Sequence, residues 1–194
     1  MRNKQKRTNF WLRWVLATCL AFGVSLIWLE VGERPDIDPL HAVTGAVVIG
    51  CAQSFVLKQH INHFWWWILA CVLSWGCLTA MGVGAIGWVT PRTELLGIRF
   101  IYGGIFGAIA GVCLGLGQWL LVLRTQIPTS GRWIRISTIC WALALALGWT
   151  VGGFVRLMTN LFLGEVIGLA VTWLVVACIT GIDLLELLKE AKGE

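Results

Sequence analysis

Few side chains in this sequence could take part in chemistry, and the most informative are three polar residues within long apolar stretches. Gln53 and Gln118 each lie about one and a half helical turns before a basic residue, Lys58 and Arg124 respectively. Glu165 lies near the start of another apolar stretch. Inside a bilayer such side chains are expected to face protein, because lipid offers them no hydrogen-bond partner. The two glutamines therefore either bond one helix to another or line a polar path.

Glu165 has two interpretations of its own. It is either an interfacial carboxylate, solvated or paired with Arg156, or a group on a proton or cation path, which is a common use of acids inside membranes. Its place at the start of the apolar stretch favours the interfacial interpretation. Glu165 is therefore predicted to form a structural contact rather than a conduction site.

Metal, cofactor and enzyme chemistry have little support in the sequence. His60 and His63 have a two-histidine spacing, but no Cys, Asp or third His lies nearby, and a metal site needs three or four ligands. Neither these histidines nor His41 lies centrally in a long apolar stretch, where a haem or chlorophyll would be held. The glycine-rich segment 82–87 follows no strand, so a turn or a re-entrant segment is expected there instead of a phosphate loop. No nucleophile with a base and no carboxylate pair is evident, and we expect a protein that is not an enzyme and has no cofactor.

The composition is that of an integral membrane protein. Of 194 residues, 58% are hydrophobic and 13% are charged, whereas soluble domains average about 25% charged. Backbone groups in a bilayer must be bonded within the segment, so the apolar stretches are expected to be helices. Six stretches approach the length needed to cross, with the first taken as a span and not as a cleaved signal: 10–28, 40–57, 64–81, 100–123, 133–154 and 161–180. All seven cysteines fall within these stretches and are expected to be small core residues.

Charge predicts how the six spans are oriented. With the N-terminus in the cytoplasm, eleven of the 15 Lys and Arg residues face inward, which fits the positive-inside rule. The inner residues are Arg2, Lys4, Lys6, Arg7, Arg13, Lys58, Arg124, Arg132, Arg135, Lys189 and Lys192. The outer ones are Arg34, Arg92, Arg99 and Arg156, alongside the acids Glu30, Glu33, Asp36, Asp38 and Glu94. Both termini are therefore expected in the cytoplasm, and the net charge of +5 indicates topology, not nucleic-acid binding.

The spans also repeat. The odd spans open with tryptophan and end in glycine, and Trp14 to Gly23 has the same spacing as Trp67 to Gly76. In the even spans, positions i and i+4 hold small residues, and position i+7 holds a polar residue in two spans and an apolar one in the third. Residues at these positions share one helix face. Those triplets are Ala46, Gly50 and Gln53; Gly111, Gly115 and Gln118; and Gly164, Gly168 and Val171. We therefore predict three tandem hairpins at 10–57, 64–123 and 133–180, followed by an amphipathic cytoplasmic tail at 182–194.

The longest small-residue stripe predicts helix packing. Gly103, Gly107, Gly111 and Gly115 recur every fourth residue, although each glycine costs a soluble helix about 1 kcal/mol relative to alanine. Small residues at this spacing let membrane helices approach closely, while a pore lining is the alternative. With Ala46, Gly50, Gly164 and Gly168, this predicts even helices packed at the centre through their small faces. The tryptophan-rich helices would then lie outside, with their indoles at the interface.

One family resemblance joins these motifs. Gly115 to Arg124, with a Gly-x-x-Gln-Trp segment leading to Leu-Arg, and the tryptophan-rich stretch from Phe64 to Gly76 resemble a group of uncharacterised bacterial, chiefly cyanobacterial, multi-span membrane proteins. The likeness extends from Gly45 to Gly153 and departs from the pattern at Gln53, which is followed by Ser54, and at Val171. It implies a protein of the bacterial plasma or thylakoid membrane and carries no known activity.

The sequence thus favours a non-enzymatic scaffold or assembly partner in a membrane complex. Its expected partners are the lipid bilayer together with other membrane proteins or a second copy of the chain, and nucleic acid is not expected. The alternative is a transporter or channel for a small solute or ion, with Gln53, Gln118 and Glu165 at its polar centre. A dry interior with an exposed apolar groove favours the scaffold, and a hydrated path at the glutamines favours transport.

Overall fold

The computed structural model describes residues 2–33 and 39–191, and for residues 2–7 and 39 it describes the backbone alone. Arg34, Asp36 and Asp38 of the predicted outer loop, and Lys192, lie outside the described residues. The six α-helices in this part of the chain are α1 (Arg2–Ser25), α2 (Pro39–Leu57), α3 (Trp66–Ala80), α4 (Leu96–Leu121), α5 (Arg132–Thr159) and α6 (Leu163–Glu190). Two short strands, β1 (Gly32–Glu33) and β2 (Val89–Thr90), and the 3-10 helix η1 (Leu123–Thr125) complete the described elements.

The all-helical prediction is confirmed, and four helices are long and apolar enough to cross a membrane. These segments are Leu40–Leu57, Leu96–Thr125, Arg132–Thr159 and Leu163–Glu190. α3 is a shorter apolar helix of 15 residues. The last helix continues without a break to Glu190, so residues 182–190 of the predicted tail are part of α6.

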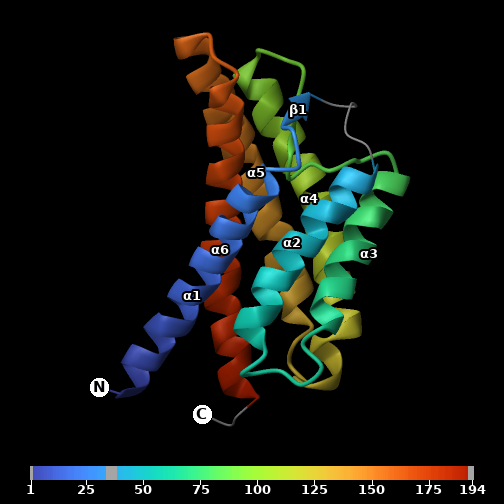
Figure 1. Cartoon of the computed structure of the whole chain (residues 1–194), viewed down its shortest axis with the longest axis vertical. Helices are drawn as coiled ribbons and strands as arrows, with labels where there is room; N and C mark the ends of the chain where they lie inside the picture. Colours follow the sequence, from blue (N-terminus) through green and yellow to red (C-terminus); the bar gives the residue numbers. More distant parts are fainter. Residues whose placement is uncertain (1, 34–38, 192–194) are drawn as a thin grey trace.

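The helices form a ring in chain order. Each helix packs against its neighbours in the sequence, and α1 also packs against α6, which closes the ring. α1 begins and α6 ends at the same end of the molecule, while β1 lies at the opposite end (Figure 1). We call these the terminal end and the strand end. Side chains that point into the ring must fill its centre.

Tryptophan fills this centre, and the predicted arrangement with tryptophan-rich helices on the outside is wrong. Eight of the 13 tryptophans are at most 4% exposed, and they are Trp14, Trp67, Trp75, Trp88, Trp133, Trp141, Trp149 and Trp173. Their rings contact one another, as where Trp141 meets Trp173 edge-on at 5.1 Å between centroids. An indole combines a large apolar body with one donor, so a ring of helices with inward-facing oxygen acceptors suits it better than the interface does.

The glycine-rich segment after α3 turns back into the strand end of the ring. Gly82 and Gly84 adopt φ of +74° and +78°, which glycine reaches without strain. The chain that follows is buried, with Ile86 and Trp88 at 0% exposure, and β2 pairs with β1 in parallel. A turn or a re-entrant segment was expected at 82–87, and the segment is a buried turn that closes this end of the ring.

Candidate functional site

Three indole hydrogen bonds join neighbouring hairpins near the centre of the ring. Trp67 Nε1 donates to Gln53 Oε1 at 2.9 Å, and Trp133 Nε1 donates to Gln118 Oε1 at 2.9 Å. Trp14 Nε1 donates to Thr180 Oγ1 at 3.1 Å, across the contact between α1 and α6. These three acceptors are at most 7% exposed. Each of these three indoles therefore has a buried acceptor on an even-numbered helix, and the three donors come from the odd-numbered helices α1, α3 and α5.

The glutamine amides also donate, so each of them links two odd helices. Gln53 Nε2 donates to Thr18 Oγ1 at 3.2 Å, on α1, while its oxygen receives the α3 indole. Gln118 Nε2 donates to Cys71 Sγ at 3.7 Å, on α3, while its oxygen receives the α5 indole. Both amide groups thus have protein partners on each side, which is what a polar group inside a membrane protein requires.

These residues surround only a small cavity. Its volume is about 30 Å³, and its lining includes Gln53, Gln118 and Thr180 together with the indoles of Trp14, Trp67 and Trp133. A single water needs at least about 10–15 Å³ of such volume, so the cavity has room for one or two waters and for no larger solute. The centre is a packed polar layer within an aromatic core.

The strand end of the ring is filled by the buried turn. Gly87 O accepts from Trp173 Nε1 and Val89 O accepts from Trp149 Nε1, both at 3.0 Å. Trp88 Nε1 donates to Ser25 Oγ at 2.8 Å, which ties the turn to α1. The carbonyl oxygens of Gly87 and Val89 are thereby bonded to tryptophans of two helices, α6 and α5, and no solvent is needed to satisfy these atoms.

A buried ion pair lies near the same end. The two terminal guanidinium nitrogens of Arg99 bond the Glu165 carboxylate, with Nη1–Oε2 at 2.8 Å and Nη2–Oε1 at 2.7 Å. The Arg99 side chain is 2% exposed and that of Glu165 is 0% exposed. Two parallel bonds of this kind are among the strongest that side chains form. Glu165 is therefore a fully paired interior group instead of a solvated interfacial carboxylate.

Arg99 also binds the loop before α4. Its Nε donates to Thr93 O at 2.6 Å, and its remaining bonds go to the carbonyl oxygens of Pro91 and Trp149. Gly153 makes room for the side chain, since a Cβ there would lie 2.6 Å from Arg99 Cδ. The arginine thus fastens α4, α5, α6 and the loop before α4 together, and its donors are used in doing so.

The expected pairing of Glu165 with Arg156 is present as a second contact. Arg156 Nη1 lies 3.2 Å from Glu165 Oε1 and also bonds Glu33 in β1. Arg92 lies 3.8 Å from the same Glu33 carboxylate. A polar pocket of about 230 Å³, lined in part by Arg99 and Arg156, opens beside this cluster. The charges alternate in sign from α4 to the strand, as in a structural network.

The structure places the predicted glycine stripe at the contact of α4 with α5. A Cβ on Gly103 would lie 2.7 Å from Ala146 Cα, and one on Gly111 would lie 2.5 Å from Ser137 O. Gly107 and Gly115 face the same helix at Trp141 and at Ser137. The stripe therefore touches an odd helix, and not another even helix as the predicted arrangement had it.

The other small residues are divided between interfaces. Gly164 and Gly168 of α6 face Gly152 of α5, whereas Gly50 of α2 faces Ile68 of α3. Ala46 is fully buried. The structure thus brings Gln53 and Gln118 to one cavity, distributes the small residues over the helix contacts around it, and puts Glu165 in a separate cluster.

Two residues of the centre and of the ion cluster were not found from the sequence. Thr180, and not Val171, completes the set of indole acceptors. Arg99, assigned only as an outer charge, is the main partner of Glu165. A signal for the first was available, because Trp14 occupies the place of Trp67 and Trp133 in its span and needs a comparable acceptor. A signal for the second was also available. Arg99 and Glu165 each lie at the start of an apolar stretch, and both stretches begin on the same predicted side of the membrane.

Cysteine and metal chemistry add nothing to this site. All seven cysteines are free, and Cys51 and Cys77 are exposed on the outside of the ring, contrary to the prediction of core positions. Over residues 2–33 and 39–191, no three His, Cys, Asp or Glu side chains lie close enough together to hold a metal ion.

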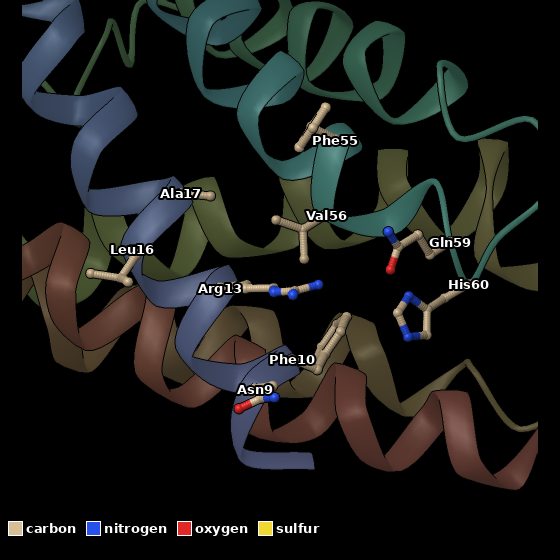
Figure 2. A pocket seen from close by; sticks show the side chains of 9 residues that line it. All are labelled: Asn9, Phe10, Arg13, Leu16, Ala17, Phe55, Val56, Gln59 and His60. Atoms are coloured by element: carbon tan, nitrogen blue, oxygen red, sulfur yellow. The ribbon is translucent and has the colours of Figure 1, made fainter. Parts of the chain in front are cut away.

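Another recess lies on the outer surface, away from these clusters. A groove of about 710 Å³ runs between α1 and α2 near the terminal end. Figure 2 shows Arg13 extending into it from α1, opposite Val56 of α2 and Gln59, which follows that helix. Leu16 and Phe55 form part of its apolar walls.

Comparisons with protein-family models, with curated proteins and with solved structures found no match to this chain.

Proposed function

We propose that this chain is a non-enzymatic, six-span integral membrane protein that acts as a scaffold or assembly partner within a membrane complex. The observation that carries the proposal is the saturated interior. Gln53, Gln118 and Thr180 bond tryptophans around a cavity of only about 30 Å³, and the buried turn fills the strand end. An interior of this kind stabilises a fixed shape and leaves the outer surface for interactions.

The six spans are proposed to form three related hairpins around an axis normal to the membrane. The three indole bonds support this, since each joins the opening tryptophan of one odd helix to a polar residue late in the preceding even helix, with α6 preceding α1 around the ring. The residues four positions after those tryptophans, Thr18, Cys71 and Ser137, are small and polar or soft. Parallel repeats of this type share an axis along the membrane normal.

The proposed orientation has the terminal end in the cytoplasm, as the excess of Lys and Arg on that side indicates. Under this orientation the Arg99–Glu165 pair lies towards the opposite side. The partners are the lipid bilayer and either other membrane proteins or a second copy of the chain.

A transporter for a small solute or ion is the second candidate, and one observation favours it. Gln53, Gln118 and Thr180 come from three different even helices and converge on one cavity, as the walls of a substrate site at a repeat axis do. This candidate requires the cavity to enlarge and the buried turn to move during a transport cycle. Glu165, which bonds Arg99 away from the cavity, would then act as a structural anchor.

Site-specific photo-cross-linking in native membranes tests the scaffold proposal. A cross-linking amino acid is placed in turn at exposed positions along one face of each helix, such as Ile105, Ile109, Val112 and Leu116 of α4. A scaffold yields one protein product, of constant mass, at positions that recur with helical spacing on one face. Lipid adducts alone on the outward faces of all six helices would contradict the proposal.

A further inference from the structure

The groove between α1 and α2 has a polar end and an apolar end. Asn9 and Arg13 of α1 face Gln59 and His60, which follow α2. Leu16 of α1 and Phe55 of α2 lie about one turn further into the molecule. Because the two helices run in opposite directions, residues later in α1 and earlier in α2 are both further from the terminal end (Figures 1 and 2). The polar groups therefore lie at the mouth of the groove and the apolar ones deeper along it.

The charge at the polar end is positive. Arg13 is exposed and, within the described residues, bonds no acidic side chain. The residues that line the groove include no Asp or Glu. Lys58 lies on the α2 side, with its Nζ 3.7 Å from the centre of the Phe55 ring. Arg13 is thus a cation in a recess whose lining has no acidic side chain, with Lys58 beside the lining residue Phe55, and a negatively charged group is the complement that the recess lacks.

The apolar walls determine what kind of anion would fit. Leu16 and Phe55 are 50% and 66% exposed, so the groove presents a large apolar surface next to its cations. A small soluble anion would bond Arg13 and leave this surface uncovered. An acyl chain would cover it while its headgroup stayed at the mouth. Basic pockets between membrane helices on the cytoplasmic side bind anionic headgroups in this way.

We propose that this groove binds one anionic phospholipid, with its phosphate at Arg13 and an acyl chain between Leu16 and Phe55. The guanidinium can bond two phosphate oxygens at once, which favours arginine over a point charge at this position. The recess of about 710 Å³ lies within the range of about 300–1,000 Å³ that is usual for ligand sites. The site goes beyond the scaffold proposal, because it assigns a particular lipid class to a particular cleft.

Native mass spectrometry of the full chain tests this assignment. The delipidated protein in a neutral detergent is titrated with dioleoyl phosphatidylglycerol or dioleoyl phosphatidylcholine, two lipids with the same chains and different net charge. The parent should retain one phosphatidylglycerol at least tenfold more tightly than phosphatidylcholine. Arg13→Gln should remove this preference, and Arg13→Lys should keep part of it.

The matched control is Arg135→Gln, which removes an exposed arginine at the same end of the molecule and outside the groove. It should leave the preference unchanged. Ala17→Phe, which fills the apolar part of the groove, should weaken both lipids and provides the test if Arg13→Gln does not fold. Equal loss in Arg13→Gln and Arg135→Gln, or no preference in the parent, would overturn the proposal. Competition by soluble glycerol phosphate as strong as by phosphatidylglycerol would do so too, since it would indicate a site for free anions.

Discussion

Trp14 donates its indole N–H to the hydroxyl oxygen of Thr180 at 3.1 Å, and together with the bond of Trp11 Nε1 to Cys178 O this contact joins the first helix of the chain to the last. The Thr180 hydroxyl donates in turn to Val176 O at 2.6 Å, so it acts both as acceptor and as donor. Around the ring, this contact is equivalent to the bonds of Trp67 to Gln53 and of Trp133 to Gln118. The ring is therefore closed by the kind of interaction that joins its other hairpins.

Removing the Thr180 hydroxyl should weaken this closure. Thr180→Val keeps the shape of the side chain but leaves the Trp14 N–H buried without an acceptor, and we expect a loss of about 1–3 kcal/mol in the free energy of unfolding. Thr180→Ser keeps the oxygen and should lose less. Thermal unfolding in detergent measures both, with Thr159→Val at an exposed site as the control. If valine and serine at position 180 behave alike, the hydroxyl does not hold the ring closed.

The glycine stripe on α4 allows a comparison of two glycines within one helix. Gly111→Ala puts a Cβ 2.5 Å from Ser137 O and Thr138 Cα, whereas a Cβ on Gly104 meets nothing within 4 Å. Overpacking of this kind costs about 1–3 kcal/mol, so Gly111→Ala should lower the melting temperature. Gly104→Ala should leave it level or raise it, since alanine is the better helix former by about 1 kcal/mol. A melting temperature that changes in the same direction in both variants would mean that the stripe is not the contact with α5.

Removing only one charge of the buried Arg99–Glu165 pair should lower the free energy of unfolding more than removing both charges. Glu165→Gln leaves the Arg99 guanidinium in the interior without a countercharge, and loss of one partner of a buried pair costs about 3–5 kcal/mol. Arg99→Met with Glu165→Leu removes both charges and should be more stable than either single variant. Chemical unfolding of Arg99→Met, of Glu165→Leu and of the double variant gives the coupling energy. A double variant whose loss equals the sum of the two single losses would show that the pair is not coupled.

The central glutamine distinguishes a packing role from a transport role. Gln118→Leu removes the acceptor of Trp133 and the donor to Cys71, and hydrogen bonds between membrane helices average about 0.6 kcal/mol. We expect a stability change of about 1 kcal/mol and no proton or cation flux in proteoliposomes, either in the parent or in Gln118→Leu and Glu165→Gln. A reproducible flux that one of these substitutions abolishes in a folded protein would favour the transporter.

The sequence predicted the helices well because their signal is local. Long apolar stretches with few charges, such as 40–57, become helices wherever the backbone must bond within itself, and α2 ends at Leu57 as expected. Gln53 and Gln118 were placed on inward faces by the same reasoning, since an exposed amide is costly in lipid. These predictions needed no knowledge of how the helices pack.

What the sequence did not provide depends on contacts between distant residues. In the sixth helix the small residues Gly164 and Gly168 point to Val171 at i+7, whereas the acceptor is Thr180, nine residues later. Only the partner Trp14, 166 residues away, selects Thr180 as the acceptor. The pairing of Arg99 with Glu165 likewise spans 66 residues and depends on the space that Gly153 leaves for the side chain. Composition alone also assigned the tryptophans to the interface, whereas the closed ring offers them acceptors inside.

The most direct test of the closed interior is the reactivity of a cysteine at position 118 in a chain whose native cysteines are replaced. Membrane-impermeant maleimide is added to sealed vesicles of each orientation, with Thr125→Cys and Glu94→Cys as exposed controls near the two ends of α4. We expect each control to react from one side only and Gln118→Cys to react from neither, because the cavity of about 30 Å³ admits no reagent. Rapid labelling of Gln118→Cys from either side, in protein that still unfolds at the parent's temperature, would contradict this expectation and indicate an open aqueous path.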